Sequence, residues 1–74
     1  MQEEAVVKEL EQSKGKALLL ELIDERTIRG KLEDVDKHMN ITLNEAEEIL
    51  DDSQPLRLGT ILVRGESIIV ISLS

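Results

Sequence analysis

Two short polar segments, residues 36–40 and 64–65, carry the side chains of this chain that are best suited to holding a nucleic-acid base. The first contains Asn40 and His38, the only histidine in the sequence, whereas the second contains Arg64. Imidazole and guanidinium groups have planar faces on which a base can stack, and a side-chain amide can offer one donor and one acceptor to the edge of a base. These residue types indicate recognition of an unpaired base rather than catalysis.

Catalytic and metal-binding sets are absent from the sequence. With one histidine, no cysteine and no serine in the context of a nucleophile elbow, no acyl-transfer set can be assembled. No histidine or cysteine cluster has the spacing of metal ligands, and the carboxylates crowd one stretch that is typical of a solvated surface. We therefore expect no enzyme activity, no metal site and no cofactor.

Length and charge restrict the remaining classes of function. The 74 residues predict one domain, residues 1–74, close to the size at which a single core needs support from oligomerisation. The 16 acidic residues outnumber the 9 basic ones, which gives a net charge of -7. This excess of acidic residues argues against non-specific electrostatic binding to duplex nucleic acid, so any contact with nucleic acid must be local.

The sequence carries no mark of secretion or of membrane insertion. It has no cysteine for disulfides, an N-terminus that is acidic at Glu3 and Glu4, and no apolar run of membrane-spanning length. We expect an intracellular, cytoplasmic protein without a membrane partner.

One short helix followed by five short strands must position the two polar segments. Apolar residues at helical spacing predict a helix over about residues 2–13, and an almost wholly apolar stretch predicts a first strand over 17–23. Alternating apolar and polar residues predict a second strand from residue 27, in which Gly30 allows a sharp bend or a close backbone approach. A third strand is expected after the turn at 36–40.

The second half of the chain is predicted to contain an acidic loop and two further strands. The acidic, weakly patterned stretch over about 45–55 is expected to be a variable loop. Strands over 56–63 and 67–73 are expected to form a hairpin, with Gly65 at the positive φ that such a tight turn needs. The predicted fold is mainly β: a short N-terminal α-helix and a five-stranded, strongly bent antiparallel barrel of the SH3-like type.

The last predicted strand supplies an argument for self-assembly. Its run Ile68-Ile69-Val70-Ile71 is apolar on both faces, so one face can join the core while the other needs additional cover. An open edge strand rich in β-branched residues promotes aggregation unless it is paired. Either the N-terminal helix covers this strand or a neighbouring subunit pairs with it.

Two blocks of the sequence resemble the motifs of the Sm and Sm-like (LSm) family of RNA-binding ring proteins, and the chain is most similar to the archaeal members. The first motif, about residues 15–43, is recognised in Leu22-Ile23-Asp24 with Arg26, Gly30-Lys31-Leu32, Asp36-Lys37-His38-Met39-Asn40 and Leu43. The second, about residues 56–73, is centred on Leu62-Val63-Arg64-Gly65 and the apolar run after it. The resemblance implies the same small bent barrel.

The resemblance also implies assembly into a closed ring. In this family the fourth strand of one subunit pairs with the fifth strand of the next, and such head-to-tail contacts either close or polymerise. A ring of seven is expected ahead of a ring of six, built from identical subunits or mixed with paralogous Sm-like subunits. The expected contact residues are Leu58, Ile61, Leu62, Ile68, Ile69, Val70 and Ile71.

For the two polar segments the resemblance implies a uridine pocket at the inner rim of the ring. His38 and Arg64 would stack on opposite faces of one base, and the Asn40 amide would read the Watson–Crick edge of a uracil. Asn40 could also simply hold the turn through its own backbone hydrogen bonds, and both roles are compatible. Gly65 would keep the second segment tight, and Asp36 would order the turn or orient Asn40 or Arg64.

Three neighbouring residues bear on how strongly such a pocket would bind RNA. Lys37 has either a phosphate contact or the ordinary role of a solvated lysine, Val35 stands where the family commonly has an aromatic residue, and Glu66 stands where Asn or Asp is usual. The expected function is a non-catalytic ring subunit that binds short U-rich single-stranded RNA and supports RNA processing or ribonucleoprotein assembly. The alternative is a ring-forming protein scaffold or interaction module with weak or lost RNA binding, which Glu66 and the acidic stretch over 45–52 favour.

Overall fold

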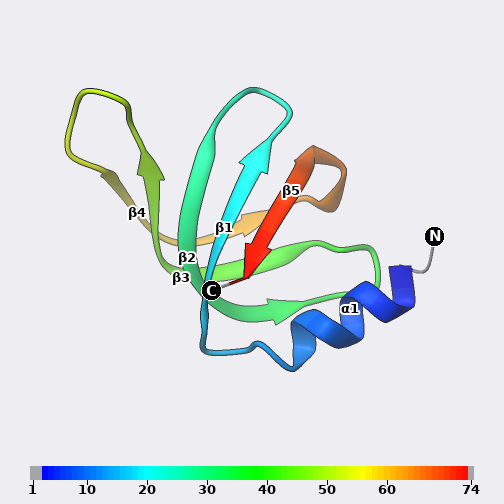
Figure 1. Cartoon of the computed structure of the whole chain (residues 1–74). Helices are drawn as coiled ribbons and strands as arrows, with labels where there is room; N and C mark the ends of the chain where they lie inside the picture. The colour runs from blue at the N-terminus through cyan, green and yellow to red at the C-terminus, as the bar shows by residue number, and fades with distance from the viewer. Residues whose placement is uncertain (1–2, 74) are drawn as a thin grey trace.

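The chain folds as one helix followed by a single, strongly bent antiparallel sheet of five strands (Figure 1). The computed structural model describes residues 3–73. Its elements are α1 (Glu3–Glu11), β1 (Ala17–Leu22), β2 (Thr27–Val35), β3 (Ile41–Ile49), β4 (Leu56–Val63), the 3₁₀ turn η1 (Gly65–Ser67) and β5 (Ile68–Leu73). The order across the sheet is β4-β3-β2-β1-β5, so β4 and β5 are its two edges. The predicted architecture of a short helix and five bent antiparallel strands is confirmed.

One apolar core joins the bent sheet to α1. Successive side chains of a strand point to opposite faces, and alternate residues of β1, β2 and β3 are buried, among them Leu20 and Leu43 at 0 % exposure. The helix contributes Leu10, which is 2 % exposed, while Val6 and Val7 pack partly buried against the same core. Burial of this apolar surface is the main force that holds the helix on the sheet.

The helix is shorter than predicted and leaves much of β5 uncovered. It ends at Glu11 rather than near residue 13, because the Ser13 N–H donates to the Leu10 carbonyl at 2.8 Å and closes a turn. Its predicted start at residue 2 lies outside the described residues. Ile69 and Val70 of β5 remain 63 % and 41 % exposed, so α1 does not provide the missing cover for this strand.

Of the two roles predicted for Gly30, a sharp bend or a close backbone approach, the close approach is confirmed. A Cβ at this position would lie 3.1 Å from the Leu43 Cβ and 3.2 Å from the Ala46 Cα, which is tighter than ordinary packing. The pairing of β2 with β3 shifts register between Arg29 and Lys31, on either side of this glycine. Gly30 therefore allows β3 to cross close to β2, which an open flat sheet would not require.

The predicted acidic loop over 45–55 is wrong in its first half, because β3 continues to Ile49 and only residues 50–55 connect it to β4. Ala46 is 1 % exposed and points into the core, which leaves its acidic neighbours on the outer face. Two cross-strand ion pairs hold those neighbours against β2: Lys31–Glu45 at 3.4 Å and Arg29–Glu47 at 2.7 Å. Ion pairs with Arg29 and Lys31 of β2 thus help to hold the acidic stretch in the sheet.

The predicted hairpin of the last two strands is also wrong. β5 pairs with β1, from Leu18 opposite Leu73 to Leu22 opposite Ile68, and the connection from β4 is the 3₁₀ turn η1. Within residues 3–73, the glycines with positive φ are Gly15 and Gly59, so Gly65 does not have the predicted backbone conformation. Because the chain crosses from one edge of the sheet to the other, β4 and β5 are both left open.

Candidate nucleic-acid interface

The turn over residues 36–40, between β2 and β3, is organised around one carboxylate. Asp36 Oδ1 accepts the backbone N–H groups of His38 at 2.8 Å and of Asn40 at 2.9 Å, and Asp36 Oδ2 accepts the Asn40 side-chain amide at 3.0 Å. Met39 takes a left-handed φ of 66° and packs partly buried against the core. His38 contributes its backbone to this network, and its imidazole is left exposed.

These donors lower the pKa of the Asp36 carboxyl group below its ordinary value. The backbone N–H of Asn40 contributes most, followed by the Asn40 side-chain amide, while desolvation opposes the effect and the His38 N–H and ring charge add to it. Each donor favours the ionised form of the carboxyl group. Asp36 is thus a fixed anion that holds the 36–40 turn together.

We expect the Asp36→Asn variant to unfold at a lower temperature than the wild type at pH 7, with a gap that closes in acid. A carboxyl group whose pKa is lowered by folding stabilises the protein above its unfolded pKa of about 3.9, and the contribution is lost as the pH falls through the lowered folded value. Thermal unfolding followed by circular dichroism between pH 7 and pH 2 measures the gap. The exposed-loop change Asp52→Asn is the matched control, and a gap that stays constant with pH would contradict the role of Asp36.

The second polar segment docks directly on the 36–40 turn. The Gly65 N–H donates to Asn40 Oδ1 at 2.8 Å. A Cβ on Gly65 would collide with the His38 carbonyl oxygen and would lie 2.9 Å from both the carbonyl carbon and the Cβ of Met39. Glycine is therefore required here by close approach and not by its φ, and this contact between two distant segments has no signal in the local sequence.

Asn40 is the link between the two segments, and part of its amide remains free. One Nδ2–H is given to Asp36, and one lone pair of Oδ1 receives the Gly65 N–H. A primary amide has two N–H donors and a carbonyl oxygen with two lone pairs, so one donor and one lone pair remain. The two bonds restrain the orientation of the amide, which leaves one donor and one acceptor for a ligand.

Arg64, which precedes η1, projects its side chain into solvent. Its guanidinium forms an ion pair with Glu66 at 3.1 Å, and both side chains are 72 % exposed. Arg64 lines a groove of about 410 Å³ with residues of β4 and of the turn after β1. His38 lines a different groove, of about 610 Å³, together with Glu66, Gly65 and isoleucines of β5. The backbone therefore brings the two predicted stacking residues close, but their side chains do not line one groove in the single subunit.

Lys37 and the predicted contact residues lie elsewhere on the surface. Lys37 is exposed and lines a groove along α1 with Glu4, Val7, Lys8 and Glu11. Four of the predicted contact residues are partly buried against the core of their own subunit: Leu58, Ile61, Ile68 and Ile71. The other three are exposed on the two edges: Leu62 at 65 %, Ile69 at 63 % and Val70 at 41 %. Each edge thus presents apolar side chains to solvent.

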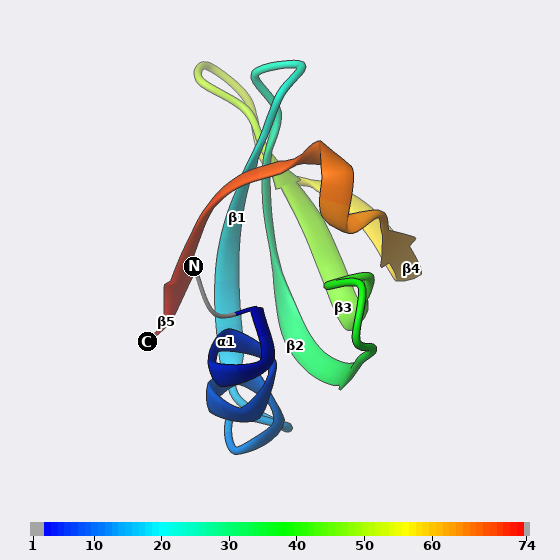
Figure 2. The ribbon, with the colours of Figure 1, turned by 90° about the vertical axis from the view of Figure 1, so that its right-hand side faces the viewer.

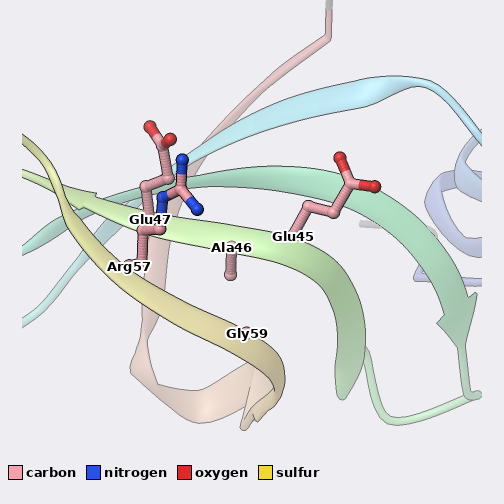
Figure 3. A pocket seen from close by; sticks show the side chains of 5 residues that line it. All are labelled: Glu45, Ala46, Glu47, Arg57 and Gly59. Atoms are coloured by element: carbon pink, nitrogen blue, oxygen red, sulfur yellow. The ribbon is translucent and has the colours of Figure 1, made fainter.

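Another groove, of about 410 Å³ between β3 and β4, is separate from the two polar segments (Figure 3). It is lined by Glu45, Ala46, Glu47, Arg57 and Gly59, and none of the predicted site residues is among them. In the part of the chain that the structure describes, no group of His, Cys, Asp or Glu side chains is placed to hold a metal ion. Across residues 3–73, none of the helical structure is long and apolar enough to span a membrane.

Comparison with known proteins agrees with this fold. Residues 8–73 match the LSM domain. An snRNP Sm-like protein of Aeropyrum pernix is 44 % identical over 55 residues, which are 74 % of this chain and 70 % of the relative. The crystal structure of a heptameric archaeal Sm protein has a TM-score of 0.83 at 42 % identity and covers 90 % of this chain and 97 % of its own.

A second solved structure relates the fold to a ligand. The Sm protein of Pyrococcus abyssi, solved in complex with a uridine heptamer, has a TM-score of 0.82 at 33 % identity, with coverage of 90 % of this chain and 94 % of that one. The family match spans most of the chain and includes both polar segments and both open edges. The chain therefore belongs to the LSM domain family.

Proposed function

We propose that this chain is a subunit of a closed ring that binds short U-rich single-stranded RNA, with one uridine held by each subunit at the inner rim. The observation that carries the proposal is the Asn40 amide, whose orientation Asp36 and Gly65 restrain with one donor and one lone pair free. The Watson–Crick edge of uracil offers an N–H donor next to a carbonyl acceptor, which complements that pair. Cytosine offers no N–H at the equivalent ring nitrogen and would leave the Asn40 acceptor unpaired.

Ring closure follows from the two open edges of the sheet. β4 exposes Leu62 and β5 exposes Ile69, and each edge has unpaired backbone groups that another strand can bond. Pairing β4 of one subunit with β5 of the next would cover both edges at once, and a repeated head-to-tail contact must close to stay soluble. The heptameric archaeal relative supports seven subunits, with six as the next choice, and the partners are copies of this chain or paralogous Sm-like chains.

Binding in this site would combine edge recognition with stacking. The backbone N–H groups of His38 and Asn40 both bond Asp36, and the His38 imidazole is exposed, so a base bonded to Asn40 would stack on that imidazole. The Arg64 guanidinium would stack on the opposite face of the base, after it separates from Glu66 and turns toward the base. Such stacking is worth about 1–3 kcal/mol per base, and Lys37 would at most approach a phosphate.

The site would act by binding alone. The Asp36 carboxylate accepts three hydrogen bonds that hold the 36–40 turn, and these bonds lower its pKa below the ordinary value. We therefore assign no catalysis and no cofactor to this chain, and we place it inside the cell as a platform for RNA processing or ribonucleoprotein assembly.

Uridine heptamer should bind more tightly than cytidine heptamer, and the preference is the direct test of the proposal. A buried amide acceptor left without its donor costs about 1–3 kcal/mol, which predicts roughly a 5- to 150-fold preference for each fully formed site. Fluorescence anisotropy measures the two affinities, and light scattering on the same samples gives the mass of the assembly with and without RNA.

The same measurements separate RNA binding from the alternative of a protein scaffold. That alternative draws on Glu66 beside the pocket and on the net charge of -7. A ring that forms but binds both oligonucleotides equally or not at all would favour the scaffold. A chain that stays monomeric in the presence of uridine heptamer would contradict ring assembly, which both hypotheses assume.

A further inference from the structure

Glu66 lies between the two groups that the proposed function assigns to base stacking. Its carboxylate is 3.1 Å from the Arg64 guanidinium, and its side chain also lines the groove that holds His38. The placement is set by η1, in which the Ser67 N–H donates to the Arg64 carbonyl at 3.0 Å and brings the residue after Gly65 back beside Arg64. Of the ion pairs within residues 3–73, only this one includes a proposed RNA-binding residue.

Stacking on a base held at His38 requires the Arg64 guanidinium to leave its described position, because Arg64 and His38 line different grooves. In that position an NH₂ group of Arg64 is directed toward Glu66 at 3.1 Å. Glu66 therefore stabilises a position of Arg64 in which the guanidinium is away from the proposed base. Both side chains are 72 % exposed, so the ion pair is weak and opens readily.

We propose that Glu66 is a competitive latch on Arg64, which RNA must displace before the base can be sandwiched. This inference rests on the proposed function and adds a regulatory residue to that site. The latch lowers the affinity of each site without altering its preference for uridine, because Glu66 does not touch the Asn40 amide that reads the base. RNA binding then also depends on whether the Arg64 guanidinium is already paired with a carboxylate.

The latch should also alter the response to salt. In the wild type, salt weakens the attraction of Arg64 for RNA and the competing ion pair together, so the two effects partly cancel. When Glu66 is neutral, the full charge of Arg64 is available to RNA, and affinity should fall more steeply with salt. A residue that only supported the fold of η1 would not move this slope.

The test is a double-mutant cycle on Glu66 and Arg64 with uridine heptamer as the probe. Glu66→Gln should raise the affinity roughly 1.5- to 5-fold for each occupied site, the equivalent of an exposed ion pair, and should steepen the salt dependence. The same change in an Arg64→Ala background should have no effect. Asp52→Asn removes one charge in the loop between β3 and β4, at the far end of the sheet from the 36–40 turn (Figure 2), and is the matched control.

The outcomes separate the latch from the proposed function. A gain from Glu66→Gln that persists without Arg64, or that Asp52→Asn reproduces, would show general charge repulsion and overturn the latch. An affinity for uridine heptamer that Glu66→Gln leaves unchanged, with the preference for uridine intact, would overturn the latch but not the proposed function. If neither the wild type nor Glu66→Gln prefers uridine heptamer over cytidine heptamer, the proposed function fails and the latch, which rests on it, fails with it. Light scattering on each variant verifies that assembly is unchanged.

Discussion

The His38→Ala variant should lose roughly 1–3 kcal/mol of binding free energy for every uridine that stacks on the ring. His38 gives its backbone N–H to Asp36 and exposes its imidazole, so alanine removes the stacking face while the 36–40 turn keeps its hydrogen bonds. One strand that occupies several sites adds these losses, so the total effect on a uridine heptamer should exceed that of any single contact. Fluorescence anisotropy with uridine heptamer measures the loss.

Lys37→Ala is the matched control for this variant. Lys37 is the exposed neighbour of His38 and offers a charge but no planar face. A lost phosphate contact would weaken binding to uridine and cytidine heptamers alike, and a solvated lysine would change neither. Wild-type affinity in His38→Ala, or a loss no larger than in Lys37→Ala, would rule out stacking on the imidazole.

The Leu62→Asp variant should break the ring into folded monomers and reduce RNA affinity by roughly 100- to 10,000-fold, because several linked sites become single sites. Leu62 is 65 % exposed on the open edge β4, so the change costs the subunit little of its own core. In the assembled ring the carboxylate would be buried at the contact with β5 of the neighbour, where an unpaired charge is strongly unfavourable. Light scattering measures the mass, and anisotropy measures the affinity.

Leu50→Asp makes the same chemical change in the connection between β3 and β4, outside the strands that form the two edges. Leu50 is 37 % exposed, and its replacement should leave the mass of the assembly unchanged. An intact ring in Leu62→Asp would show that β4 is not the contact edge. A folded monomer in both variants would show that the effect of the charge is not specific to β4.

The fold could be predicted from the sequence wherever the signal is local. Apolar periodicity located the helix and the strands, and a glycine within a strand pattern located the close backbone approach at Gly30. Two features failed because they depend on distant partners. The acidic stretch joined β3 because cations of β2 pair with it, and β5 paired with β1 rather than β4 because the strand crosses the sheet after η1.

The candidate site shows the same division between local and distant information. The sequence identifies Asp36, Asn40 and Gly65 by type, but the hydrogen bond that joins the last two links segments that are separated by the whole of β3 and β4. The importance of Gly65 was predicted for the wrong physical reason, since the structure needs a close approach and not a positive φ. The direction of the Arg64 side chain was also not predictable, because an exposed ion pair with Glu66 sets it.

Because the two edge strands are left open, the stability of the subunit depends on the concentration of the protein. A subunit whose two edges are paired only by neighbours is stabilised by mass action, so dilution acts on it in the same direction as heating. Newly made chains at low concentration would expose Leu62 and Ile69, and only accumulation would protect them. The level of expression thereby becomes a determinant of folding, and a mixed population of paralogous chains would compete for the same edges.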